Sequence, residues 1–127
     1  MRRVVVDMQN TLFADAIASA LRNFDSDFDV SCSESPEKTV QLCELTAAQI
    51  LIMEVTNYTP WRLEERLRLR SVIKERNPDC KIVLVVDENT EKKLADKVRL
   101  AKKDGLIDNF IYSSVSASYL SAVIDTL

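Results

Sequence analysis

Three acidic residues in this sequence stand where catalytic or metal-binding groups often lie. Asp7, Glu54 and Asp87 each directly follow a run of three to five Val, Ile, Leu or Met residues. Runs of this kind are typical of strands that are buried on both faces of a parallel sheet. The carboxyl ends of such strands meet at one edge, where folds of this type carry out their chemistry. We therefore expect the three carboxylates to converge there, as acid–base groups or as ligands of a divalent cation.

The composition excludes several common kinds of catalytic site. Histidine is absent, which removes the usual general base, the usual metal ligand and the Ser-His and Cys-His arrangements. A single glycine, Gly105, cannot form a glycine-rich phosphate loop. Cys32, Cys43 and Cys80 are odd in number and far apart in the sequence. They indicate free thiols in a reducing cytoplasm.

Length and charge restrict the class of protein further. The chain has 127 residues, of which 46 % are hydrophobic, and a net charge of −3. We expect one domain over residues 1–127, and we leave open a further domain beyond residue 127. Direct nucleic-acid binding is not expected from an acidic chain without interleaved basic and aromatic residues. No membrane contact or secretory signal is expected, because no run reaches about 18 apolar residues and Met1-Arg2-Arg3 enters the first strand directly.

Strand and helix patterns alternate strictly along the chain. The predicted strands are residues 4–7, 28–32, 50–55, 82–86 and 110–112. Helix starts are predicted at Asn10 or Thr11, Ser35-Pro36, Thr59-Pro60, Asn89 or Thr90, and Ser116. Five such β-α units predict a doubly wound α/β fold, with a parallel sheet, helices on both faces and right-handed crossovers.

The predicted helix from Pro60 to Arg76 is unusually basic. Arg66, Arg70 and Lys74 recur at i, i+4 spacing, and we interpret them as part of a solvated charged face. The predicted inner face of this helix consists of Leu69, Val72 and Ile73. The other apolar residues of the region predict an exposed patch for a partner or a second copy, made of Tyr58, Trp61, Leu63 and Leu67.

Several stretches resemble the receiver domain of bacterial response regulators, the CheY-like domains of two-component phosphorelay systems. They are Val5-Val6-Asp7 with the helix start Leu12-Phe13, residues 49–54, residues 74–85, and Gly105 ahead of the fifth strand. The resemblance covers the whole chain and implies a flavodoxin-like (βα)5 fold with strand order 2-1-3-4-5. It also implies phosphorylation of an aspartate at the end of the third strand, with help from a divalent cation.

The resemblance is incomplete at the positions that carry this chemistry. The family has two adjacent cation-holding acids after the first strand, which correspond here to Asp7 and Met8. Its phosphoacceptor aspartate corresponds to Glu54. A methionine thioether is a poor ligand for a hard cation such as Mg²⁺. We therefore expect no cofactor, although weak Mg²⁺ binding by Asp7, Glu54 and Asp87 is left open.

Three further positions of the family site are also changed. The hydroxyl residue that ends the fourth strand corresponds to Val86, and the lysine that ends the fifth strand corresponds to Ser113, which Ser114 follows in place of a proline. The switch aromatic corresponds to Phe110, which lacks a hydroxyl. Without cation and lysine, little would stabilise a transferring phosphoryl group. Glu54 is then a solvated acid, a relic, or a permanent charge that imitates the phosphorylated state.

These observations predict a pseudo-receiver without enzymatic activity, which acts by protein–protein interaction in signalling or transcriptional control. By analogy with the family, a protein partner or a second copy would bind the face built from the fourth helix, fifth strand and fifth helix. Asp96, Asp104 and Asp108 could pair there with basic residues across a dimer. The alternatives are a phosphorylation-competent receiver with an altered site, a flavodoxin-like ligand binder whose pocket is lined by residues 56–59, and a stand-alone enzyme using the three acids.

Overall fold

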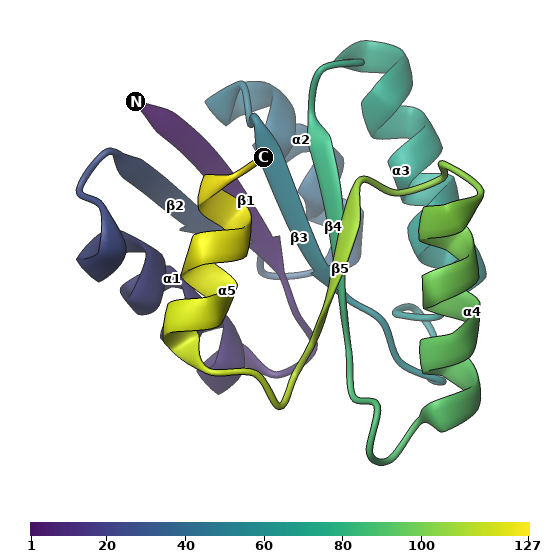
Figure 1. Ribbon diagram of the computed structural model, residues 1–127. Coiled ribbons are helices and arrows are strands. Elements are labelled where there is room, and N and C mark those ends of the chain that lie inside the picture. The colour runs from purple at the N-terminus through teal and green to yellow at the C-terminus, as the bar shows by residue number, and fades with distance from the viewer.

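The protein, described over residues 1–127 by a computed structural model, alternates five strands with five helices (Figure 1). All ten predicted elements are present. The strands are β1 Arg2–Asp7, β2 Phe28–Cys32, β3 Ile50–Glu54, β4 Lys81–Val86 and β5 Asn109–Tyr112. The helices are α1 Thr11–Phe24, α2 Pro36–Thr46, α3 Leu63–Arg76, α4 Lys92–Lys103 and α5 Ala117–Asp125.

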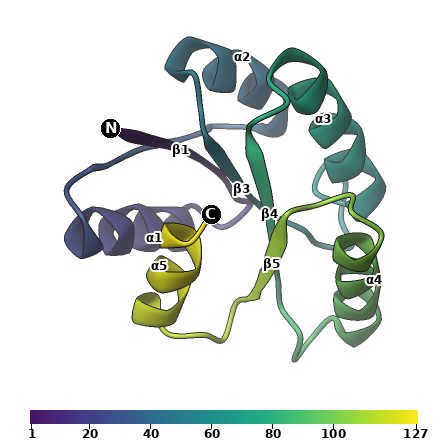
Figure 2. The same cartoon turned by 45° about the horizontal axis from the view of Figure 1, so that its top comes forward.

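The strands form one parallel sheet in the order β2-β1-β3-β4-β5. Helices α1 and α5 cover one face of this sheet, and α2, α3 and α4 cover the other (Figures 1 and 2). This arrangement confirms the predicted doubly wound, flavodoxin-like fold. The carboxyl ends of the strands, with the loops that leave them, lie at the bottom of Figure 1.

Each face of the sheet packs on its own hydrophobic layer. Along β1, Val4 and Val6 pack with α1 and α5, whereas Val5 packs with α2 and α4. Along β3, Ile52 and Met53 divide in the same way. We call these the α1/α5 layer and the α2–α4 layer. Because successive side chains of a strand point to opposite faces, the position of a residue along its strand decides which layer it enters.

Several helix boundaries are as predicted. The side chain of Asn10 caps α1 by accepting the Phe13 N–H at 3.0 Å, and Ser116 caps α5 by accepting the Tyr119 N–H at 3.1 Å. Such caps satisfy N–H groups that have no partner within the helix. Gly105 follows the end of α4 with φ 77°, a left-handed conformation in which glycine avoids the strain of a side chain.

Two predicted helix starts were wrong, each because a turn precedes the helix. Helix α3 begins at Leu63 and not at Pro60, because the Trp61 N–H first closes a turn on the Tyr58 carbonyl at 2.8 Å. Helix α4 has Glu91 as its N-cap. The two predicted capping residues before it, Asn89 and Thr90, instead donate backbone N–H groups to Asp87 at 3.0 and 3.3 Å.

The exposed apolar patch predicted around α3 was also wrong. Leu63 and Leu67 pack against the α2–α4 layer, and only Tyr58 of the proposed set is exposed.

None of the five helices combines the length and the apolar character that a membrane crossing requires. All three cysteines are free, as predicted. Burial raises the pKa of Cys43 to about 12 and that of Cys80 to about 11.

Candidate functional site

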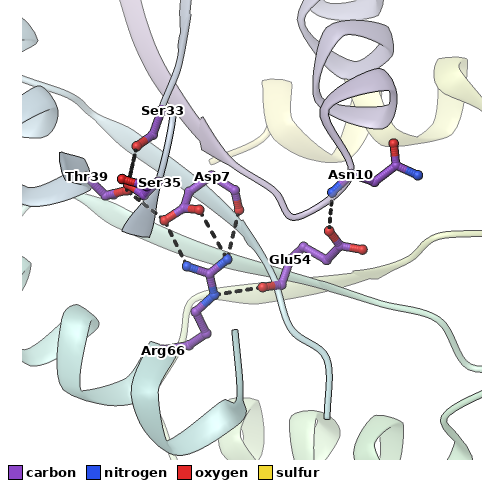
Figure 3. A network of polar contacts seen from close by, with 7 residues as sticks. All are labelled: Asp7, Asn10, Ser33, Ser35, Thr39, Glu54 and Arg66. Atoms are coloured by element: carbon purple, nitrogen blue, oxygen red, sulfur yellow. Dashed lines mark hydrogen bonds and ion pairs between the residues drawn. The ribbon is translucent and has the colours of Figure 1, made fainter. Parts of the chain in front are cut away.

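The end of β1 carries a buried ion pair between Asp7 and Arg66. Both side chains are 1 % exposed. The Arg66 guanidinium reaches Asp7 from α3: Nη1 lies 2.8 Å from Oδ2, and Nη2 lies 3.2 Å from Oδ1 and 3.1 Å from the main-chain oxygen (Figure 3). This two-pronged contact is the strong form of a carboxylate–guanidinium interaction.

Further contacts complete a cluster around the pair. The Arg66 Nε–H donates to the Glu54 carbonyl oxygen at 2.7 Å. The buried Thr39 hydroxyl donates to Asp7 Oδ2 at 2.7 Å and lies 2.8 Å from Ser33 Oγ. The Asp7–Arg66 cluster, defined as Asp7, Thr39, Arg66 and the Glu54 carbonyl, therefore ties β1 and β3 to α2 and α3 (Figure 3).

The interpretation of Arg66 as part of a solvated face was wrong. Arg66 stands seven residues before the buried Ile73, and seven residues are almost two helical turns. It therefore belongs to the inner face of α3 and not to the outer one. This spacing was visible in the sequence, but the charge of the side chain argued against burial. No sequence signal marked Thr39 as its companion.

Glu54 points away from the cluster. In the sheet, Asp7 is the register partner of Met53, which packs in the α2–α4 layer. Glu54 is one residue further along β3, so its side chain leaves on the opposite face. Its Oε1 accepts the backbone N–H of Asn10, the α1 cap, at 3.1 Å (Figure 3). The expectation that all three acids converge is therefore wrong for Asp7.

Glu54 and Asp87 instead line an open pocket together with Glu91. The pocket has a volume of about 420 Å³, and Thr56 and Tyr58 contribute to its wall. A hydrogen bond from the Thr90 side chain lowers the pKa of Asp87. Burial raises the pKa of Glu91, and the charges of Asp87 and Glu54 add to this rise. Three carboxylates at one pocket disfavour an anionic ligand such as a flavin phosphate.

The residues present do not fit the divalent cation that the receiver resemblance implies. The Arg66 guanidinium contacts both carboxylate oxygens of Asp7. No group of three or more His, Cys, Asp or Glu side chains is arranged to hold a metal ion. A cation at Asp7 would have to displace a guanidinium that already neutralises the carboxylate.

The remaining site positions predicted from the sequence are buried or half-buried and contact neighbouring residues of the fold. Met8 is 6 % exposed in the α1/α5 layer, and Val86 is 1 % exposed in the α2–α4 layer. Ser113 is half-buried, and its N–H donates to the Val86 carbonyl at 3.0 Å. The Phe110 ring lies edge-on to Tyr112, with centroids 5.5 Å apart. Met8 and Val86 are thus core residues and offer no polar side-chain group to a ligand.

No protein-family model matches the sequence, and no curated protein matches it either. Solved structures do resemble it. A response regulator from Thermotoga maritima superposes with a TM-score of 0.78 at 16 % identity, over 99 % of this chain and 96 % of that one. The chain has the receiver-domain fold. A CheY-like protein from Pseudomonas aeruginosa PAO1, TadZ, superposes with a TM-score of 0.73 at 21 % identity, over 99 % of this chain and 92 % of that one.

An orphan response regulator of H. pylori superposes on this receiver-fold chain with a TM-score of 0.69 at 19 % identity, over 98 % of this chain and 94 % of that one. At these identities the likeness concerns the fold. In this fold, Asp7, Glu54 and Val86 are the last residues of β1, β3 and β4.

Proposed function

We propose that this chain is an atypical receiver domain that signals through contacts with another protein chain and not through aspartyl phosphorylation. The observation that carries this proposal is the position of Glu54. Its carboxylate stands at the end of β3, where receiver domains accept a phosphoryl group. It accepts a hydrogen bond from the Asn10 backbone N–H. Around it, the buried Val86 offers no hydroxyl and Ser113 offers no amine.

These substitutions remove the groups that would act on a phosphoryl donor. Transfer of a phosphoryl group depends on cations and donors that stabilise the charge on its oxygens. Here the carboxylates of Glu54, Asp87 and Glu91 line the same pocket and would repel the donor. The proposal therefore includes no enzymatic activity and no required cofactor. A role in two-component signalling or transcriptional control, and a cytoplasmic location with three free thiols, belong to the same proposal.

The proposed binding surface is the face formed by α4, β5 and α5. Phe110 and Tyr112 on β5 lie beside Tyr119 on α5, which is 58 % exposed. Lys102 and Arg99 border these rings, with Arg99 Nη1 2.7 Å from the Tyr112 hydroxyl. Aromatic and arginine side chains are enriched among residues that dominate binding energy. A protein partner or a second copy would bury them.

The charge pairing predicted across a dimer needs revision for two of its acids. Asp96 pairs with Arg99 within α4, and Asp108 pairs with Lys74 at 3.2 Å while accepting the Ile82 N–H at 2.8 Å. These two acids therefore already have partners inside one chain. Their charges contribute little to pairing across a dimer.

Incubation with acetyl phosphate and Mg²⁺, followed by intact-mass measurement, tests the proposal. We expect no gain of a phosphoryl group, whereas a receiver with a complete aspartate site, treated in parallel, should gain one. A Mg²⁺-dependent gain that disappears in Glu54→Gln and persists in Glu88→Gln would contradict the proposal. It would favour the alternative of a phosphorylation-competent receiver with an altered site.

A further inference from the structure

The Asp7–Arg66 cluster leads to an inference about how this site is regulated. We infer that the Arg66 guanidinium is the built-in cation of the domain and takes the place of an exchangeable metal ion at Asp7. The inference rests on the proposed function for its biological meaning: a site with its own cation would depend on neither metal nor phosphate.

The geometry of the guanidinium supports this assignment. Asp7 is the one cation-holding acid of the resembling family that this chain retains. Both of its carboxylate oxygens and its main-chain oxygen accept hydrogen bonds from Arg66. The Glu54 carbonyl accepts a fourth, at 2.7 Å. The cation therefore gathers oxygen atoms from the ends of two neighbouring strands, as a bound metal ion would.

Burial keeps the Arg66 guanidinium paired with the Asp7 carboxylate. An ionised carboxylate that is 1 % exposed needs a partner, because an unpaired buried charge is strongly unfavourable. Arginine keeps its charge at every physiological pH. Unlike a dissolved ion, it is attached to α3 and does not depend on concentration. The pair is thus present in every folded molecule.

The attachment also fixes neighbouring elements. Arg66 belongs to α3, Thr39 to α2, Asp7 to β1 and Glu54 to β3. A cation that belongs to a helix holds that helix against the strand ends, whereas an exchangeable ion would leave it free to move. A conformational equilibrium shifts only if a ligand contacts its states differently. Because Arg66 already binds both carboxylate oxygens of Asp7, Mg²⁺ cannot contact them in one conformation more than in another.

Thermal unfolding in EDTA, MgCl₂ and CaCl₂ at matched ionic strength tests the inference. We expect the wild-type Tm to be the same in all three solutions. Arg66→Ala should unfold at a lower temperature in EDTA, because it leaves the Asp7 carboxylate buried without a cation. Millimolar Mg²⁺ or Ca²⁺ should raise its Tm again, because the vacated space is lined by oxygen atoms. Methylguanidinium chloride should act similarly. Arg68→Ala, an exposed arginine on the same helix, is the matched control and should show neither effect.

A second variant covers the case in which Arg66→Ala does not fold. Asp7→Asn/Arg66→Met removes both charges and should fold without gaining any response to metal. A rise in the wild-type Tm with millimolar Mg²⁺ would overturn the inference, as would an Arg66→Ala protein with unchanged Tm. Phosphorylation of a wild type whose Tm ignores Mg²⁺ would overturn only the proposed function. A wild-type Mg²⁺ response without phosphorylation would overturn only the assignment of Arg66.

Discussion

Arg66 and Asp7 depend on each other for their energetic effect. Removing one partner of a buried ion pair typically costs about 3–5 kcal/mol, whereas replacing both with apolar groups is often neutral. The pair is therefore poor evidence for high stability. The energetic effect of Thr39 also depends on Asp7, because its hydroxyl donates a hydrogen bond to the same carboxylate oxygen that Arg66 Nη1 contacts.

Thr39→Val tests this dependence without removing a charge. Valine keeps the shape of threonine but leaves Asp7 Oδ2 with one donor fewer. We expect the free energy of unfolding to fall by about 1.5–3 kcal/mol, the range for hydrogen bonds to charged groups. Urea denaturation measures the change. Thr46→Val on the same helix is the matched control, because the Thr46 hydroxyl only donates to the Leu42 carbonyl. Equal losses in both variants would contradict the role given to Thr39.

At the scale of elements, the start of α4 carries an unfavourable charge. Burial and the carboxylates of Asp87 and Glu54 raise the pKa of Glu91. A raised pKa in the folded state means that the folded chain holds the proton more tightly than the unfolded one. The associated stability is fully present below the unfolded pKa, near 4.5, and is lost as pH rises through the raised value.

Glu91→Gln should therefore raise the Tm at pH 7 and leave it unchanged at pH 4. The gain should be below about 1 kcal/mol, because a partly exposed charge is screened by water. Tm measured across pH checks the trend. Glu37→Gln, an exposed acid in the first turn of α2, serves as the control and should show no such pH-dependent gain. A gain that persists at pH 4 would contradict this explanation.

At the scale of the whole molecule, the face of α4, β5 and α5 presents the side chains proposed for binding. Tyr119→Glu would place a charge among Phe110 and Tyr112. If the protein forms a dimer through this face, we expect dissociation to become easier by roughly tenfold or more, the effect of losing about 1.4 kcal/mol or more at a binding hot spot. Light scattering over a concentration series measures it. Tyr58→Glu, which changes a 67 % exposed tyrosine outside this face, should leave the mass unchanged. Equal effects of both variants would contradict this choice of face.

The order of elements could be predicted from the sequence because each signal is local. Apolar runs marked the strands, and the capping residues Asn10 and Ser116 marked helix starts. The starts of α3 and α4 were missed because hydrogen bonds within the preceding loops, such as those to Asp87, delay the helix. These contacts form only when the loop folds back on itself.

The residue types along the chain were enough to predict the fold class, and they leave no carboxylate at Met8, no hydroxyl at Val86 and no amine at Ser113. Residue identity is enough for both, since a missing ligand or hydroxyl is missing in every conformation. Which of these groups come into contact depends on how the chain folds. Asp7 and Glu54 leave adjacent strands on opposite faces of the sheet, and Arg66, 59 residues from Asp7 along the chain, is brought to it by the packing of α3. A cation that is part of the chain has no sequence motif, because its site exists only once the helix lies on the sheet.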